Sequence, residues 1–222
     1  MAQESNPTVK EIALAVRGNA VVQALKRKGY DAWYFARAEE AAQKILELIP
    51  AGASVGVGGS ITIREMRIPE ALRQRGHEVF DHWNPELSGE ERALTLRRQL
   101  TSDVFITSAN AISMDGQIVN VDGTGNRVAS SIFGPKKVII VAGINKLVPT
   151  LEDALSRSRG VAGVMNAARL KCDTPCVELG RCSDCQRPDR ICNVTVIFHR
   201  RPQDGSGSRD YHVIIVGQEL GF

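Results

Sequence analysis

The chain has 222 residues, of which 43% are hydrophobic and 24% are charged, a composition typical of one compact α/β domain over residues 1–222. The net charge of +3 is small and basic residues alternate with acidic ones, so nucleic-acid binding is not indicated. The longest apolar runs are far shorter than the roughly 20 residues that cross a bilayer, and the N-terminal stretch lacks a secretory-signal pattern. We therefore expect a cytoplasmic protein without a membrane partner.

Helices and strands alternate along the first half of the chain. The spacing of Thr8 and Glu11 is that of a capping box, and the helix it begins ends at Gly29. A strand is predicted at 30–36, a helix at 38–49, and a short buried strand around Val55 and Val57. A further helix is predicted directly after it, over the letters ITIREM.

The second half continues this alternation. Strands are predicted at 77–81, 103–109, 116–121 and 138–143, and helices at 88–100 and from about 149 to the cysteines. Such alternating units predict a largely parallel, Rossmann-like sheet with helices on both faces. The final strands, 193–201 and 209–217, flank the turn-rich letters PQDGSGS, which predicts a C-terminal β-hairpin.

A glycine-rich loop, VGVGGSIT, lies where a strand gives way to a helix. Gly58, Gly59 and Ser60 leave backbone N–H groups open there, which suits a phosphate or carboxylate. The alternative is a tight turn that needs glycine for its backbone angles. The letters do not match the dinucleotide fingerprint, so NAD is not predicted.

Polar side chains gather between 108 and 127, directly after a predicted buried strand, where open α/β sheets place their ligand crevice. Asp115 or Asp122 can act as a general base, and Arg127 can hold an anion. The alternative is that the two Asp-Gly pairs only make turns. The histidines lie apart and His82, like Trp83, is expected to have a structural role. The amides in this segment are Asn110, Asn120 and Asn126.

All five cysteines fall within residues 172–192, in the spacing C-x3-C-x5-C-x2-C-x6-C. Disulfides are disfavoured in a cytosolic chain, so this density of thiols indicates a metal site, either zinc or an iron–sulfur cluster. The alternative is free cysteines or a redox pair. The candidate ligands are Cys172, Cys176, Cys182, Cys185 and Cys192.

The letters GVGGSIT, TSANAISMDGQIVNVDGTGNRVAS, FGPKKVIIVAGINKLV and TPCVELGRCSDCQRPDRICNVTVI together resemble the lactate-utilisation (LUD) domain family, in its form with a cysteine-rich C-terminal segment. The resemblance implies a fold of the sugar-phosphate isomerase and CoA-transferase (NagB/RpiA-like) group. It implies anion contacts from Gly58, Gly59, Ser60 and Thr62, and a pocket lined by Asn110, Asp115, Asn120, Asp122 and Asn126. It also implies that Cys176, Cys182, Cys185 and Cys192 are the metal ligands, with Cys172 as an extra.

The function that the resemblance implies is an accessory redox or metal-binding component of lactate or other 2-hydroxyacid utilisation. Its expected partners are a small anionic metabolite and an electron-transfer protein, and a homodimer is plausible for the fold. One alternative is a stand-alone acid–base enzyme that binds a phosphorylated or CoA-linked molecule at Gly58 to Ser60, with a structural metal. Another is a non-catalytic ligand sensor.

Overall fold

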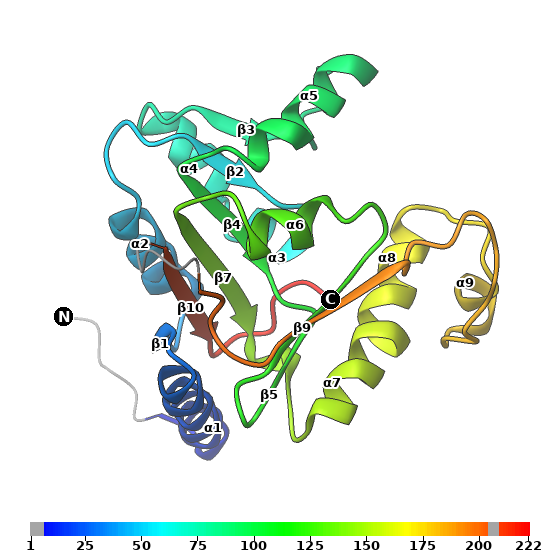
Figure 1. The fold of residues 1–222 in the computed structure, drawn as a ribbon. Helices are drawn as coiled ribbons and strands as arrows, with labels where there is room; N and C mark the ends of the chain where they lie inside the picture. The colour runs from blue at the N-terminus through cyan, green and yellow to red at the C-terminus, as the bar shows by residue number, and fades with distance from the viewer. Residues whose placement is uncertain (1–6, 204–208) are drawn as a thin grey trace.

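The computed structural model describes residues 7–203 and 209–222. Its main sheet has six parallel strands in the order β1-β10-β7-β4-β2-β3 (Figure 1). The prediction of a largely parallel α/β sheet is confirmed. The strands of this sheet are β1 (Asp31–Phe35), β2 (Val55–Val57), β3 (Val79–Asp81), β4 (Val104–Ser108), β7 (Lys137–Gly143) and β10 (Asp210–Val216).

Both faces of this sheet are buried under other elements. Along β7, Ile139 and Val141 pack on one face, whereas Val138 and Ile140 pack on the other, as the alternation of strand side chains requires. The first face is covered by α2 (Ala38–Leu48), α3 (Ile61–Glu65) and α4 (Ile68–Gln74). The second is covered by α1 (Val9–Arg27) and by residues of a second sheet, and α5 (Gly89–Gln99) packs near β2 and β3.

The second sheet is smaller and mixed, in the order β8-β5-β6-β9. Strand β6 (Ile118–Asp122) pairs antiparallel with both β5 (Ala111–Ser113) and β9 (Val194–Phe198), while β8 (Leu147–Val148) lies parallel to β5. The strand predicted at 116–121 is therefore present as β6. The other helices are α6 (Asn126–Ile132), α7 (Leu151–Arg157), α8 (Val164–Arg169) and α9 (Pro175–Leu179).

The predicted C-terminal hairpin is wrong. Its two strands form, but β9 joins the second sheet, whereas β10 lies between β1 and β7 in the main sheet. The burial of the two strands explains the difference: β10 is buried along all but its first residue, as a central parallel strand must be, and β9 is mostly half-buried. The tip of the predicted hairpin, 204–208, lies outside the described residues.

The helix predicted after 149 is present, with a change of winding in its middle. A π-helical segment, η2 (Ser158–Gly163), joins α7 to α8 without a break. Widened turns of this kind are frequent at functional sites. A short 3₁₀ turn, η1 (Ile144–Lys146), follows β7 and turns the chain towards the second sheet.

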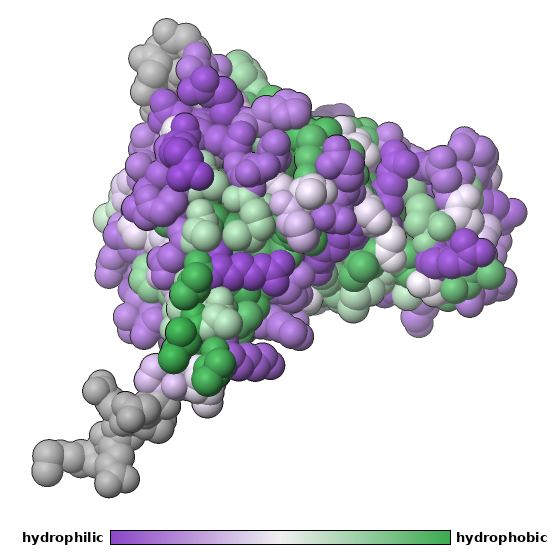
Figure 2. Space-filling view, turned by 90° about the horizontal axis from the view of Figure 1, so that it is seen from below, coloured by the Kyte–Doolittle hydropathy of each residue, from purple (hydrophilic) through white to green (hydrophobic). Residues whose placement is uncertain are grey.

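The N-terminal half of α1 carries apolar side chains that nothing in the described chain covers. Val9, Ile12 and Val16 are 85%, 52% and 66% exposed, and Figure 2 shows apolar atoms gathered beside the first described residues. The helical spacing of these residues places them along one side of α1.

Homodimerisation stays a prediction. Among the described residues, no helix combines the length and hydropathy that a membrane crossing requires.

Candidate ligand pocket and cysteine cluster

A cavity of about 260 Å³ opens at the carboxyl ends of the parallel strands. Its walls come from the residues that follow β2, β3, β4 and β7, together with the end of β6 and the π-helical segment. Open α/β sheets bind their ligands at this edge. The polar residues that line it are Ser60, His82, Trp83, Ser108, Asn110, Asp122, Thr124, Asn126, Arg127, Lys146, Ser158, Asn166 and Arg169.

The glycine loop contributes two of its predicted residues to the cavity. Gly59 and Ser60 line it, and the Ser60 hydroxyl also accepts a hydrogen bond from the N–H of Ile63, 3.3 Å away, at the start of α3. Gly58 lies behind the wall, where a Cβ atom would meet the Thr107 hydroxyl at 2.9 Å. Close packing against Thr107 therefore explains why residue 58 is a glycine. At residue 59 a side chain would crowd Trp83 and His82 in the cavity wall.

Arg127 is buried and does not offer an N–H to a ligand. Its Nε donates to the carboxylate of Asp122 over 3.3 Å. Its terminal nitrogens donate to the Ser108 and Val121 carbonyls and to the side-chain oxygens of Asn110 and Asn120. All five N–H groups of the guanidinium thus have partners inside the protein. The prediction that Arg127 clamps an anion directly is not supported by this geometry.

Asp122 is held by the same network. One carboxylate oxygen accepts from the N–H groups of Thr124 and Gly125, at 3.1 and 2.7 Å, and the other accepts from Arg127. These contacts form the turn that leads into α6. Asp122 lines the cavity, but the structure gives it a role in shaping the loop.

The remaining predicted polar residues divide in two. Asn110 and Asn126 line the cavity, whereas Asn120 is fully buried behind it. Asn110 and Asn120 tie the end of β4 to β6, because Asn110 accepts from the Val121 N–H and Asn120 accepts from the Asn110 N–H. Asp115 lies in the exposed turn between β5 and β6 and does not border the cavity.

Lys146 is the functional candidate that the sequence analysis missed. It lies in η1, is 4% exposed, and places its amine 2.7 Å from the hydroxyl oxygens of both Thr62 and Ser108. Burial, with the charges of Arg157 and Arg127, lowers its pKa from 10.5 to about 7. Its position directly after the most apolar strand was a sequence signal, since that strand ends at the ligand edge of the sheet.

The wall after β3 supplies aromatic ring nitrogens. A Cβ atom on Gly59 would lie 3.2 Å from Trp83 Nε1 and 3.4 Å from His82 Nε2, so both nitrogens face this glycine. The side-chain nitrogen of Gln99 lies 3.0 Å from His82 Nδ1. The same amide nitrogen donates to the Val57 and Phe80 carbonyls over 2.8 and 3.0 Å, so Gln99 holds the His82 ring against β2 and β3. Burial lowers the pKa of His82, which favours the neutral ring.

Trp83 is enclosed by two cations. The guanidinium carbons of Arg64 and Arg169 lie 5.1 and 4.5 Å from its ring centre. Arg169 comes from α8 and borders the cavity itself. His82 and Trp83 were expected to have only a structural role, but the structure places both in the wall of the cavity.

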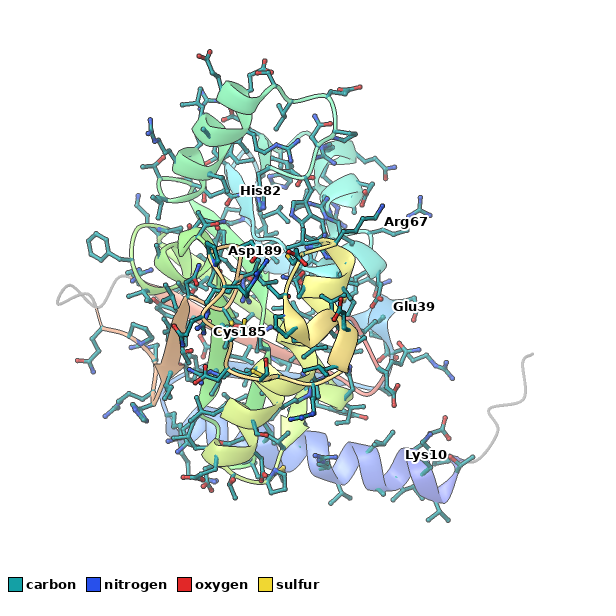
Figure 3. The ribbon with its side chains drawn as sticks, turned by 90° about the vertical axis from the view of Figure 1, so that its right-hand side faces the viewer. Lys10, Glu39, Arg67, His82, Cys185 and Asp189 are labelled. Carbon is teal, nitrogen blue, oxygen red and sulfur yellow. The ribbon has the colours of Figure 1, made fainter. Side chains whose placement is uncertain are left out.

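Four of the five cysteines line one small second cavity, of about 20 Å³. They are the four that the family resemblance implies as ligands, and Cys172 does not border it. All five are free thiols. Figure 3 looks onto this side of the molecule, with Cys185 and Asp189 labelled on the cysteine segment. The four are Cys176, Cys182, Cys185 and Cys192.

The thiols suit zinc or an iron–sulfur cluster by their chemistry, but their side chains are not in ligating positions. Over the described ranges, no three His, Cys, Asp or Glu side chains are arranged to hold a metal ion. Arg190 braces the loop, since its guanidinium donates to the backbone carbonyls of Cys185 and Cys192 over 2.6 and 3.1 Å. The backbone thus gathers four thiols at one cavity, and ligation requires these side chains to come closer together.

The two cavities share a wall. Gly163 and Ile191 border both of them. The N–H of Asn193, next to Cys192, donates to the Asp122 carbonyl over 3.0 Å, and a Cβ on Gly123 would meet the Ile191 carbonyl at 3.2 Å. The cysteine segment therefore packs directly against the loop that follows β6.

Comparison with protein-family models agrees with the sequence resemblance. The model of the LUD domain family matches residues 19–216. None of the curated proteins matches the chain. A DUF162 family protein from Deinococcus radiodurans shares 16% identity over 95% of this chain and 99% of its own, with a TM-score of 0.49. Ribose 5-phosphate isomerase from Plasmodium falciparum shares 15% identity over 50% of this chain and 52% of its own, with a TM-score of 0.31.

Proposed function

This chain belongs to the LUD domain family, and we propose that it is an accessory component of lactate or other 2-hydroxyacid utilisation that binds a small anionic metabolite at the carboxyl edge of its main sheet. The observation that carries the proposal is the buried amine of Lys146. It borders the cavity, makes no ion pair with any described carboxylate, and has Arg127 and Arg157 nearby. The positive charges of these arginines beside an amine that has no acidic partner favour an anionic ligand, whether or not the amine itself is protonated.

The size and polarity of the cavity favour a small hydroxylated carboxylate. A volume of about 260 Å³ lies below the range of roughly 300–1,000 Å³ typical of drug-sized ligands. Trp83 places an N–H donor and His82 a ring nitrogen beside Gly59, and Arg169 adds a positive charge at the cavity wall. These groups can hold a carboxylate, while the hydroxyls of Ser60 and Ser108 and the Asn110 amide can meet a 2-hydroxyl group.

The second part of the proposal concerns the cysteine cluster. Cys176, Cys182, Cys185 and Cys192 would hold the metal group, and an iron–sulfur cluster there would supply one-electron transfer to a protein partner, whereas zinc would fasten the segment. Arg190 would offset part of the thiolate charge, since it already braces the backbone of two of these residues.

The cysteine proposal is tested by anaerobic purification followed by quantification of iron, sulfide and zinc per chain. We expect a stoichiometric metal content that Cys182→Ser and Cys185→Ser abolish. Cys172→Ser is the matched control and should keep the metal, because this thiol does not border the cavity. Equal metal loss in all three variants, or no metal in the wild type, would contradict the proposal.

The ligand proposal is tested by calorimetric titration with L-lactate, glycolate, pyruvate and inorganic phosphate. We expect one site per chain for the 2-hydroxyacids or 2-oxoacids, with an affinity at least about tenfold weaker in Gly59→Ala. Asp115→Asn should bind as the wild type does, because that carboxylate lies in an exposed turn outside the cavity. Binding that Asp115→Asn removes and Gly59→Ala keeps would place the ligand elsewhere.

A stand-alone acid–base enzyme acting on a phosphorylated or CoA-linked molecule is the second candidate function. The low pKa of Lys146, about 7, favours it, because a general base works best with a pKa near the working pH. A thermal-shift panel of sugar phosphates and acyl-CoAs separates the two candidates. A specific stabilisation by one of these compounds, with silence from the hydroxyacids and oxoacids, would favour the enzyme.

A further inference from the structure

Lys146 has the surroundings of a reacting amine. Three features coincide at its nitrogen: nearly complete burial, access to the ligand cavity, and hydroxyl neighbours in place of a carboxylate. A lysine that only stabilises a fold normally reaches solvent or pairs with an acid. Thr62 and Ser108, which hold its amine, each have another contact inside the protein, to the Leu220 and Ala109 carbonyls over 3.2 and 3.1 Å. These hydroxyls can therefore hold the amine in position by hydrogen bonds even when it is uncharged.

The charged groups around Lys146 keep it partly unprotonated. Arg157 from α7 and Arg127 from α6 oppose its charge, and Glu65 from α3 is the acidic group that favours it. Burial has the largest effect, and the resulting pKa of about 7 leaves a large fraction of amine with a free lone pair at neutral pH. An anion clamp would need the charged form, whereas a nucleophile needs the lone pair.

We propose that the Nζ atom of Lys146 attacks the carbonyl carbon of a 2-oxoacid and forms a Schiff base with it. The inference rests on the proposed function, since 2-oxoacids are the products of 2-hydroxyacid oxidation. It makes that function more specific in two ways. It names Nζ of Lys146 as the reacting atom, and it names the 2-oxoacid as the ligand that is bound covalently.

The step is balanced without any reactant other than solvent water. The nitrogen lone pair forms the C–N bond, and the electrons of the carbonyl double bond move to oxygen, which takes up a proton. The nitrogen then loses a proton, the hydroxyl group takes up a second proton and leaves as water, and a C=N⁺ iminium remains; one of the two protons comes from the nitrogen and the other from solvent water. Thr62 and Ser108 lie 2.7 Å from the nitrogen, within reach to relay these protons.

The wall after β3 explains why the substrate should carry a carboxylate next to its carbonyl. Trp83 Nε1–H faces Gly59 and can donate to a carboxylate oxygen, the His82 ring lies beside it, and Arg169 contributes a positive charge at the cavity wall. A simple ketone lacks this group and gains nothing from these donors. A 2-hydroxyacid can occupy the same donors but has no carbonyl for the amine to attack.

Reductive trapping tests the proposal on the wild-type protein. The protein is incubated with pyruvate and sodium cyanoborohydride, digested, and searched by mass spectrometry for the reduced adduct on each lysine peptide. We expect labelling at Lys146 at least about tenfold faster than at other lysines, because the others are charged at neutral pH. Acetone should label this lysine far less, and L-lactate should slow its labelling by pyruvate.

The pH dependence gives a second readout. The labelling rate at Lys146 should rise with pH to a plateau just above 7, whereas labelling of an ordinary lysine keeps rising towards a pKa of about 10.4. Lys146→Met should lose the adduct, with its fold checked by circular dichroism.

The outcomes distinguish the inference from the proposed function. Calorimetric binding of pyruvate without an adduct at Lys146 overturns the Schiff base and leaves the metabolite pocket standing. Adducts spread evenly over several lysines also overturn it. Failure of every hydroxyacid and oxoacid to bind, together with no adduct, overturns both.

Discussion

Replacing Lys146 by Met should stabilise the protein at neutral pH. Met has a similar length and no charge, so the variant does not need to bury an amine whose protonated form is disfavoured in the fold. The hydroxyls of Thr62 and Ser108 keep their carbonyl contacts after the change, so neither is left without a partner. A functional lysine at such a position is expected to reduce stability.

The size of the effect follows from the pKa of Lys146. A fall from 10.5 to about 7 corresponds to a penalty of about 4 kcal/mol at pH 7, at about 1.4 kcal/mol per pH unit. Loss of the two hydrogen bonds made by the amine offsets about 1 kcal/mol each. We therefore expect the free energy of unfolding to rise by about 2 kcal/mol.

Urea unfolding at several pH values checks this estimate. Between pH 7 and 10.5 the unfolded wild type binds more protons than the folded form at this site, so wild-type stability rises with pH. The advantage of Lys146→Met should therefore be largest at or below pH 7 and should vanish near pH 9. A variant that is less stable at pH 7, or whose difference does not change with pH, would refute this account of the buried amine.

Three further substitutions test other parts of the site. Asp122→Asn should lower the free energy of unfolding by about 3 kcal/mol, because it leaves the buried Arg127 without its acidic partner; an unchanged urea midpoint would contradict this role. Gly59→Ala should weaken carboxylate binding at least about tenfold in calorimetry with little change in melting temperature, because its methyl group would lie 3.2 Å from Trp83 Nε1; an unchanged affinity would show that the ligand does not use this wall. Asp81→Asn should destabilise the protein at pH 7, since hydrogen bonds from two arginines outweigh burial and lower the pKa of this carboxyl from 3.8 to about 2; in urea titrations the difference should be present above 3.8 and shrink as the pH falls towards 2, and a constant difference would exclude the ionic origin.

The main sheet was predictable because its strands carry a strong local signal. Apolar runs such as that of β7 identify buried strands, and their alternation with helices favours parallel pairing. The sheet partners of β9 and β10 were not predictable from the Gly- and Ser-rich sequence between them, because residues of this type indicate a change of chain direction but do not specify the partner strand. The sequence of β10, buried along nearly its whole length, indicated a central strand better than the turn did.

The sequence analysis expected ligand-binding residues directly after β4, and the structure has a cavity at that edge of the sheet, although Asp122 and Arg127 bind each other there. Asp122 and Arg127 stood out in the sequence because they lie in a polar, turn-rich segment, and the structure uses both to hold that segment in place. Lys146 did not stand out, because a single lysine gives no sign of burial, although its position after the most apolar strand placed it at the ligand edge of the sheet. Only the tertiary contacts of its amine with Thr62 and Ser108 show that it differs from a surface lysine.

The position of Trp83 in the cavity wall makes its intrinsic fluorescence a reporter of ligand binding. The chain has two tryptophans, and Trp33 does not border the ligand cavity. In a Trp33→Phe variant, the remaining indole would lie between Arg64 and Arg169 with its N–H facing Gly59. An anion that draws Arg169 away from the ring would change the emission of this indole, so candidate ligands can be ranked by fluorescence titration of the unlabelled protein.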